Sequence, residues 1–328
     1  MSKGLTNLGN TCYMNSSLQC LMHLPYLLPH NKSLIKDCRR RLKGNDFTLM
    51  REFFKIQKEM WTGESSVVNP RLFIKEFMKQ CNQKNIFFES FLQNDAQEFI
   101  TIIIDLLHDS IKRKVQIEIS GKPSNTYDLM KVKSIESWRK FFESNYSYII
   151  KNFYSKLHSN LECPRCGYHT DNYEPISTIT LTLKDKYKSI YHCLDEFISK
   201  EKLDSWKCDK CHREVSPTKK MQFFELSPIL IFSIKQFRRG MKINQYIEFP
   251  EYLSMDKYSI NYKKENTKYR LSGICVHQGN LNGGHYYAMC YNYLNSKWSM
   301  YNDEQVSEVT IDKVLKEEPY CLFYIKTD

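Results

Sequence analysis

The segment Gly4-Leu5-Thr6-Asn7-Leu8-Gly9-Asn10-Thr11-Cys12-Tyr13-Met14-Asn15 contains a cysteine in the first turn of a predicted helix. The two residues before Cys12 are of types that often cap helices, and apolar residues follow it at helical spacing. The positive end of a helix dipole favours a thiolate, so we expect a lowered pKa for Cys12. Gly4 and Gly9 suggest a tight loop that brings Asn7 back toward the sulfur, where its amide could donate to an oxyanion.

A second block, far along the chain, supplies the other groups of a thiol protease. It reads Gly283-Gly284-His285-Tyr286-Tyr287 and is followed by Trp298 and by Asn302-Asp303. A histidine can act as general base for a cysteine, and an Asn or Asp can orient the imidazole. A lone cysteine at a helix start is more often a buried apolar residue. The flanking residues and the distant histidine favour the catalytic interpretation here.

Two Cys-x-x-Cys pairs predict a metal site. Cys163 with Cys166, and Cys208 with Cys211, provide four soft ligands for a tetrahedral zinc ion. Each pair is followed by a small or polar residue, as expected at a zinc knuckle. The long gap between the pairs indicates strands that run out and back, with the metal at the far end. Redox or disulfide roles are less favoured because intracellular thiols stay reduced. We expect one structural Zn²⁺ and no organic cofactor.

These segments resemble conserved boxes of the ubiquitin-specific proteases, a family of deubiquitinating enzymes. The cysteine segment is similar to the family's cysteine box, and Gln93-Asn94-Asp95-Ala96-Gln97-Glu98-Phe99 is similar to its next box. The block from Gly284 to Asp303 resembles its histidine box, and the four cysteines fall where the family carries zinc ligands. The matches keep their order from Gly4 to about Ile325, which is nearly the whole chain.

The resemblance implies a role for each candidate catalytic residue. Cys12 is the nucleophile, His285 the general base and Asn302 the residue that orients the imidazole. Asn7 contributes to the oxyanion hole, and Asp303 assists it or takes the orienting role instead. Many relatives carry Asp where this chain has Asn302, and an Asn brings no negative charge to the imidazolium.

The implied reaction is thiol-dependent hydrolysis of the isopeptide or peptide bond after the C-terminal glycine of ubiquitin. A Gly-Gly terminus fits a narrow channel, and Gly283 and Gly284 would line it without side chains. Tyr286 is assigned to the same substrate-binding surface. Gln93 and Asp95 are expected to contact the ubiquitin tail, whose arginines suit a nearby acid. Asp95 also has the spacing of a helix capping box with Glu98, and that explanation is sufficient without any substrate.

Composition and charge limit the classes of protein to which this chain could belong. The chain has 328 residues, twelve cysteines, no leading apolar segment and no long apolar run. We expect a reduced, intracellular protein of the cytoplasm or nucleus, with no membrane association.

The net charge is +11, with small basic clusters at Arg39–Arg41, Lys112–Lys114 and Arg238–Arg239. Since basic residues are interleaved with acids, nucleic-acid binding is unlikely. Nothing suggests an obligate oligomer, so we expect a monomer.

The secondary-structure pattern predicts helices first and strands later, which is typical of an α+β fold. Predicted helices cover residues 12–23, 46–60, 70–81, 94–113 and 134–151, with a loop or hairpin at 115–130. Predicted strands cover residues 178–183, 229–234, 271–277, 286–291 and 320–325. The resemblance sharpens this to a papain-like peptidase with a helical thumb, a β-rich palm and zinc-tipped β fingers. It implies a single catalytic domain over 1–328, thumb-like to about 155 and strand-rich from about 156.

Two alternative functions remain open at this point. The chain could process another ubiquitin-like modifier with the same fold and chemistry. It could also be an inactive module that binds ubiquitin, although such modules usually lack the nucleophile or the histidine, and both are present here.

Overall fold

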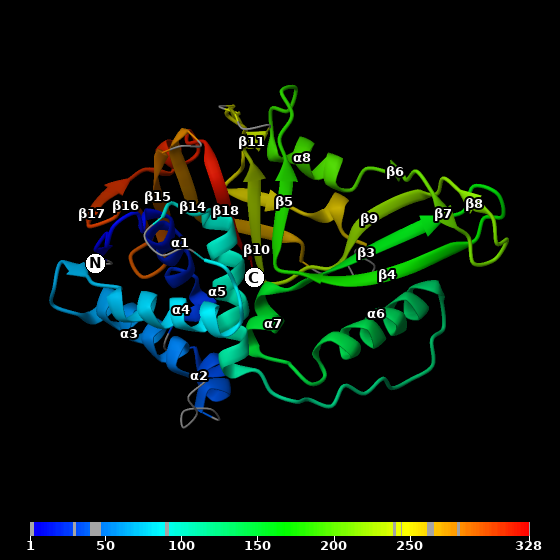
Figure 1. Ribbon diagram of the computed structural model, residues 1–328, viewed down its shortest axis with the longest axis horizontal. Helices are drawn as coiled ribbons and strands as arrows, with labels where there is room; N and C mark the ends of the chain where they lie inside the picture. The colour runs from blue at the N-terminus through cyan, green and yellow to red at the C-terminus, as the bar shows by residue number, and fades with distance from the viewer. Residues whose placement is uncertain are drawn as a thin grey trace.

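The computed structural model describes residues 3–28, 31–39, 47–88, 92–238, 241–243, 245–260, 266–280 and 283–327. Helices dominate the first part of the chain and strands the second (Figure 1). Within this described part of the chain, no helix is long and apolar enough to cross a membrane. The basic clusters predicted at Arg39–Arg41 and Arg238–Arg239 lie largely outside it.

A group of helices forms one side of the molecule, around a central buried helix. Every residue of that central helix, α1, is buried, because it packs between α5 and the large sheet. Its apolar side chains join a core made by the surrounding helices and one face of the sheet. The helices are α1 (Cys12–Met22), α2 (Lys32–Arg39), α3 (Thr48–Thr62), α4 (Arg71–Gln83) and α5 (Ala96–Ile111).

An eight-stranded sheet, here called the palm sheet, lies beside these helices. Its order is β17-β16-β15-β14-β18-β10-β5, with β13 also paired to β14. Its strands are β5 (Thr178–Thr182), β10 (Ile229–Lys235), β13 (Tyr252–Ser254), β14 (Lys268–Asn280), β15 (Gly283–Asn292), β16 (Lys297–Asn302), β17 (Gln305–Val309) and β18 (Pro319–Lys326). All neighbours are antiparallel except β10 and β5. A second core, beneath α8 (Ile190–Phe197), covers the other face.

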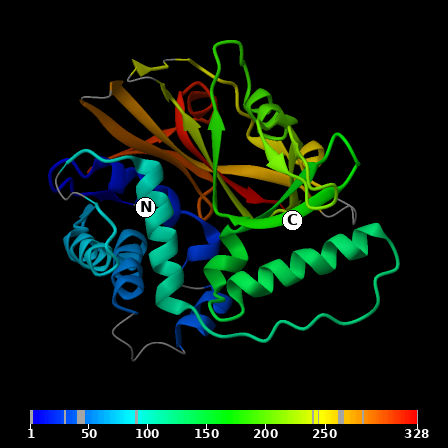
Figure 2. The same ribbon diagram turned by 45° about the vertical axis from the view of Figure 1, so that its right-hand side comes forward.

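A four-stranded sheet, here called the finger sheet, extends away from the palm (Figure 1). Its order is β4-β3-β9-β6, and a short β7–β8 hairpin continues it. The strands are β3 (Ser155–Glu162), β4 (His169–Ile176), β6 (Glu201–Lys202), β7 (Trp206–Lys207), β8 (Glu214–Val215) and β9 (Thr218–Glu225). Figure 2 shows α6 (Thr126–Phe142) running beneath this sheet, where the Ser137 hydroxyl donates to the Tyr173 carbonyl at 2.7 Å.

Most predicted elements are present, and one predicted helix is wrong. Residues 134–151 are not one helix but the end of α6 and the separate α7 (Tyr148–Phe153). The reason is local capping: the Asn125 side chain accepts from Asp128 N and starts α6, and Ser147 accepts from Ile150 N and starts α7. The predicted loop therefore ends at residue 125 rather than 130. The helices α2 and α8 were not predicted.

The N-terminal strand joins the cysteine loop to the palm. Strand β1 (Gly4–Leu5) pairs in parallel with β2 (Val67–Val68), and Leu5 N donates to the Asp303 carbonyl at 2.8 Å. A Cβ atom on Gly4 would lie 2.3 Å from the carbonyl oxygen of Glu304. Only glycine permits this approach, which holds the two ends of the candidate site together. The remaining short elements are β11 (Phe237–Arg238), β12 (Met241–Lys242) and α9 (Ile311–Val314), with 3₁₀ turns at Pro25–Leu27 and Asp256–Tyr258.

Candidate active site

The loop before α1 folds back on itself around the Asn7 side chain. The Asn7 Oδ1 atom accepts hydrogen bonds from Gly9 N at 3.0 Å, Thr11 N at 3.3 Å and the Thr11 hydroxyl at 3.2 Å. Gly9 and Asn10 have left-handed φ values of 98° and 52°, which the tight turn requires. Thr11 precedes the helix as predicted, but its hydroxyl bonds within this loop and does not cap the helix. Cys12 is therefore held as the first residue of α1.

The candidate histidine lies on the palm, in the strand against which α1 packs. His285 belongs to β15, and the backbone N–H of the next residue, Tyr286, lies near enough to the Cys12 sulfur to lower the pKa of the thiol. The His285 Nε2 atom lies 2.6 Å from Asn302 Oδ1 and 3.9 Å from Asp303 Oδ2. Because an amide oxygen can only accept, Nε2 carries the hydrogen, and a neutral ring then has Nδ1 as its basic nitrogen.

The expectation of a lowered pKa for Cys12 is wrong. Burial raises the pKa of this thiol above its ordinary value, because Cys12 is only 4% exposed and a thiolate there loses its hydration. The Tyr286 N–H lowers the pKa by less, and the negative charge of Asp303 raises it further. Desolvation thus outweighs the helix N-terminus and favours the neutral thiol.

This raised pKa predicts slow alkylation of Cys12 in the free protein. Only the thiolate reacts, so its iodoacetamide rate should be low at pH 7 and climb with pH past the range where free cysteine titrates. Peptide mass mapping at several pH values would measure the rate at Cys12 alone. A rate that levels off below pH 7 would mean a preformed thiolate and contradict the prediction.

Asp303 connects the cysteine loop, α1 and the palm. Its Oδ2 accepts from Asn7 Nδ2 at 2.8 Å, and its Oδ1 accepts from Asn15 Nδ2 at 2.8 Å. Asp303 adopts a left-handed φ of 49° in the turn between β16 and β17. Sequence reasoning missed Asn15. Its one available signal was a polar residue three positions after Cys12, a spacing that makes the two residues neighbours on a helix surface.

Gln93 and the two glycines meet across the boundary between helices and palm. The Gln93 side chain pairs with both backbone groups of Gly284, at 3.1 Å to its oxygen and 3.2 Å from its nitrogen. A Cβ on Gly284 would lie 2.2 Å from His277 Nε2, whereas Gly283 has open space around it. The His277 side chain therefore leaves no space for a side chain at position 284. His277 had no place among the candidate site residues predicted from the sequence.

Asp95 and Tyr286 are occupied by structural contacts. The Asp95 carboxylate caps α5 by accepting from Gln97 N at 2.7 Å, and it also accepts a short hydrogen bond from the Tyr320 hydroxyl. Asp95 is therefore the N-cap of α5, but its partner is Gln97 N, and the predicted capping box with Glu98 is not formed. The Tyr286 ring is buried against Tyr320, with ring centroids 5.4 Å apart. The part of Tyr286 nearest the candidate nucleophile is its backbone.

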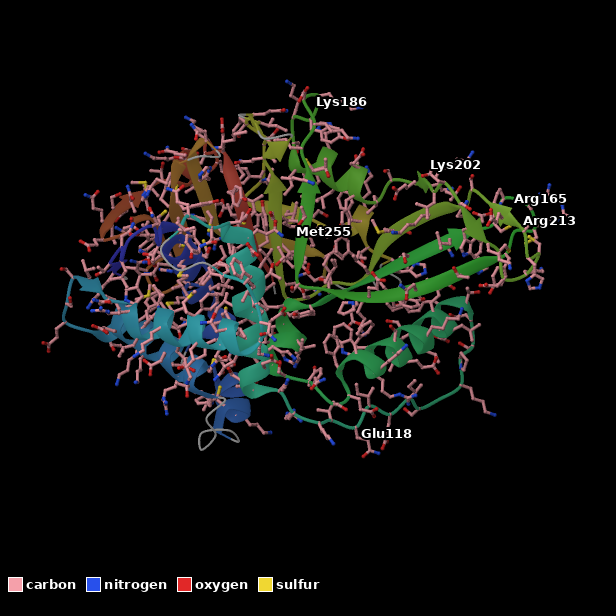
Figure 3. All side chains as sticks on the ribbon, viewed as in Figure 1. Glu118, Arg165, Lys186, Lys202, Arg213 and Met255 are labelled. Carbon is pink, nitrogen blue, oxygen red and sulfur yellow. The ribbon has the colours of Figure 1, made fainter. Side chains whose placement is uncertain are left out.

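The four cysteines of the two Cys-x-x-Cys pairs meet at the far end of the fingers. Their sulfur atoms lie within 4.8 Å of one another, including 4.0 Å from Cys163 to Cys211 and 3.6 Å from Cys166 to Cys208. Four Zn–S bonds of about 2.3 Å in a tetrahedron require S···S distances of about 3.8 Å. This cluster could therefore hold a metal ion. Arg165 and Arg213, labelled in Figure 3, mark this end of the molecule.

The backbone around the cluster has the form of two matched knuckles. Gly167 N donates to the Cys163 carbonyl at 3.1 Å, and His212 N donates to the Cys208 carbonyl at 2.8 Å. Gly167 and His212 both have left-handed φ values, 65° and 55°. The two tight turns direct their sulfur atoms to one point, as the spacing predicts.

Comparison with known proteins gives consistent matches over nearly the whole chain. The family model "Ubiquitin carboxyl-terminal hydrolase" matches residues 3–324. Ubiquitin carboxyl-terminal hydrolase Usp2 of Drosophila melanogaster is 31% identical over 99% of this chain and 35% of its own length. Ubiquitin carboxyl-terminal hydrolase 8 of Saccharomyces cerevisiae is 31% identical over 98% of this chain and 70% of its own length. The chain thus spans about a third of one relative and most of the other.

Solved structures agree with the sequence matches. A SAGA DUB module of Ubp8, Sgf11, Sus1 and Sgf73 bound to monoubiquitin contains a chain with a TM-score of 0.77 and 28% identity, covering 99% of this chain and 69% of that one. A second structure of that module, bound to ubiquitin aldehyde, gives a TM-score of 0.73 and 27% identity, covering 99% of this chain and 70% of that one. The predicted α+β fold class is confirmed.

Proposed function

The chain belongs to the ubiquitin carboxyl-terminal hydrolase family, whose members are cysteine-type deubiquitinating enzymes, and on this premise we propose that it hydrolyses the bond after the C-terminal glycine of ubiquitin. The observation that carries the proposal is the 2.6 Å hydrogen bond between His285 and Asn302, on strands that pack against the helix beginning with Cys12. The scissile bond would be the isopeptide bond to a substrate lysine, or a peptide bond.

The reaction begins from the neutral thiol. His285 Nδ1 removes the proton of Cys12 as the sulfur attacks the glycine carbonyl, so charge forms only when substrate excludes water. The tetrahedral oxyanion is held by the backbone near Cys12 and by Asn7, whose amide nitrogen has a second hydrogen beyond the one given to Asp303. The intermediate collapses to a thioester as His285 returns its proton to the leaving amine. Water then hydrolyses the thioester, with His285 again acting as base.

Asn302, rather than Asp303, is proposed to orient the imidazole. Asn302 lies within hydrogen-bond distance of His285 Nε2, whereas the nearer Asp303 oxygen is 3.9 Å away. Asp303 instead bonds Asn7 and Asn15. Its proposed part in catalysis is therefore to hold the oxyanion donor.

Substitution of Asn302 tests whether this residue, rather than Asp303, orients the imidazole. Asn302→Ala is expected to lower kcat about 10²-fold with little change in KM, because the base loses its orientation. Asn302→Asp should keep activity within about tenfold, since a carboxylate also accepts the Nε2 hydrogen and stabilises the imidazolium. Steady-state hydrolysis of a fluorogenic ubiquitin amide measures both. Near-normal kcat in Asn302→Ala would assign the orienting role elsewhere.

The ubiquitin tail is proposed to run along the surface formed by Gln93 and the start of β15. Gly283 and Gly284 offer backbone groups without side chains, and Gln93 already bonds those of Gly284. Asp95 supplies negative charge behind Gln93 for the arginines of the tail. The buried Tyr286 contributes through its backbone.

The four-cysteine cluster is proposed to bind one structural Zn²⁺ through Cys163, Cys166, Cys208 and Cys211. The sulfur distances and the two knuckles support this, and four cysteine ligands leave no open position for a reacting water. When bound, zinc supplies a cross-link that fixes the end of the finger sheet. The whole chain, 1–328, is proposed to be one catalytic domain with a thumb-like part to about 155.

Ubiquitin and ubiquitinated proteins are the proposed partners, and the protein is proposed to act as a monomer. Ubiquitin accompanies the similar Ubp8 chains, which are themselves part of a larger module. An intracellular site of action, in the cytoplasm or nucleus, is supported by twelve cysteines that are all free thiols.

Competing modifiers provide the test of this function. The C-terminal fluorogenic amides of ubiquitin and of several ubiquitin-like modifiers would be offered to the folded protein at equal concentration. We expect release from ubiquitin at a kcat/KM at least about tenfold above the others. Preferential release from another modifier would support the first alternative. Tight ubiquitin binding without release would support an inactive binding module.

A further inference from the structure

Asn15 is a buried polar residue at the meeting point of three segments of the site. It is 1% exposed and lies one helical turn after Cys12 on α1. Its Nδ2 atom donates to Asp303 Oδ1 at 2.8 Å and also lies 3.4 Å from the Leu5 carbonyl and 3.3 Å from the Thr6 carbonyl. One amide group thus faces a carboxylate on the palm and two carbonyls of the cysteine loop.

The orientation of the Asn15 amide is fixed by charge. All three neighbours of Nδ2 are acceptors, so turning the amide over would set its oxygen against the Asp303 carboxylate. In the present orientation Asn15 Oδ1 is buried without a hydrogen-bond partner among the described residues. A buried polar atom without a partner costs stability, and such atoms often accompany function. The presence of an Asn at position 15 is therefore better explained by the hydrogen bonds that its N–H groups donate than by a contribution to stability.

The group held by Asn15, the Asp303 carboxylate, is itself connected to the proposed oxyanion donor Asn7 and to the proposed orienting residue Asn302. The second oxygen of Asp303 accepts from Asn7 Nδ2, and Asp303 follows Asn302 directly in the chain. Its backbone has a left-handed φ and its carbonyl accepts from Leu5 N, so the turn is tied down at several points. A shift of the Asp303 carboxylate would move the Asn7 amide and the Asn302 turn together.

We propose that Asn15 is a positioning residue for the reaction. From inside α1 it holds the Asp303 carboxylate, and Asp303 in turn aims the Asn7 amide at the oxyanion and keeps the Asn302 turn in place against His285. Asn15 touches neither substrate nor the reacting atoms and acts only through Asp303. The inference rests on the proposed function.

The first test separates positioning from stability. Asn15→Ala is expected to lower kcat about 10- to 100-fold on fluorogenic ubiquitin amide, with KM changed less than about threefold. The matched control is Asn152→Ala, which removes another buried Asn amide, one that donates to the Tyr148 carbonyl at 2.7 Å in α7. The control should lose thermal stability but keep kcat. Equal loss of kcat in both variants would reduce Asn15 to a structural residue and overturn the proposal.

A second variant guards against misfolding. Asn15→Leu keeps the branched shape of the side chain and removes the unpartnered oxygen, so its Tm should fall less than that of Asn15→Ala. Its kcat should nevertheless fall as in Asn15→Ala. Wild-type kcat in a folded Asn15→Leu protein would overturn the proposal.

A double-mutant cycle tests the route through Asp303. If Asn15 acts through that carboxylate, Asn15→Ala combined with Asp303→Ala should cost no more than about threefold beyond Asp303→Ala alone. Losses that multiply would show independent roles and overturn the proposal. If wild-type protein releases nothing from ubiquitin, the proposed function fails and this inference falls with it. If the wild type is active and the losses multiply, only the inference falls.

Discussion

Cys12→Ala is expected to abolish both hydrolysis of ubiquitin amides and covalent reaction with ubiquitin that carries a thiol-reactive C-terminal electrophile. Loss of the nucleophile from a comparable triad lowers kcat on the order of 10⁶-fold, because no other group can form the acyl intermediate. None of the remaining eleven cysteines, all of which the structure describes, is in a disulfide; most are buried, and four of them are the proposed zinc ligands. Intact mass should therefore show a single adduct on wild-type protein and none on the variant.

The matched control for this experiment is a cysteine substitution outside the candidate active site. Cys81 is fully buried in α4 and has no proposed part in the site, so Cys81→Ala should react with the electrophile as the wild type does. Ubiquitin affinity of Cys12→Ala, measured by calorimetry, should stay within about threefold, since a small thiol contributes little to a large interface. An adduct that persists in Cys12→Ala would place the nucleophile elsewhere.

Cys208→Ser is expected to release the metal and to unfold the end of the finger sheet. Binding of structural zinc contributes about 10–16 kcal/mol in zinc-finger peptides at pH 7, so loss of one ligand removes most of what orders this end. Here the two knuckles join the β3–β4 hairpin to the β7–β8 hairpin, and β7 and β8 are only two residues long. We expect native mass spectrometry to show about one zinc in the wild type and none in the variant. Limited proteolysis should then cut the variant between residues 163 and 217.

Cys193→Ala is the control for the zinc prediction. Cys193 is buried in α8 beneath the palm sheet and is not part of the metal cluster. Its replacement should lower Tm modestly while zinc content and the proteolytic pattern stay the same. Ubiquitin binding should weaken in Cys208→Ser alone. A finger region that stays protected without metal would contradict a structural role for zinc.

Local sequence patterns were sufficient to predict much of the fold. The helices α1, α3, α4 and α5 and the main palm strands have strong periodicity, so their existence and type follow from the residues. The pattern failed where short capping signals divided a polar stretch, as at Asn125 and Ser147. It also missed α8, which is eight residues long and begins with a Ser189 cap.

The candidate site was predicted in its residue types but not in its contacts. The cysteine box, the histidine box and the metal pairs could be read from spacing, because that chemistry requires particular side chains. The sequence could not choose between Asn302 and Asp303 as the partner of His285, since they are adjacent. The turn between β16 and β17 directs one toward the imidazole and the other toward Asn7 and Asn15.

Residue identity therefore determined which groups are available for the chemistry: a thiol, an imidazole, two amides and four sulfurs that could hold a metal ion. Only the tertiary structure decided the direction of the Cys12 pKa shift and the hydrogen-bond partner of Asn15. The helix start predicts a lowered thiol pKa, but packing of α1 against β15 buries the sulfur and desolvation raises the pKa instead. Likewise, Asn15 became a partner of Asp303 only when residues 288 positions apart were brought to 2.8 Å. Burial and long-range hydrogen bonds are properties of the packed chain, so local sequence does not contain them.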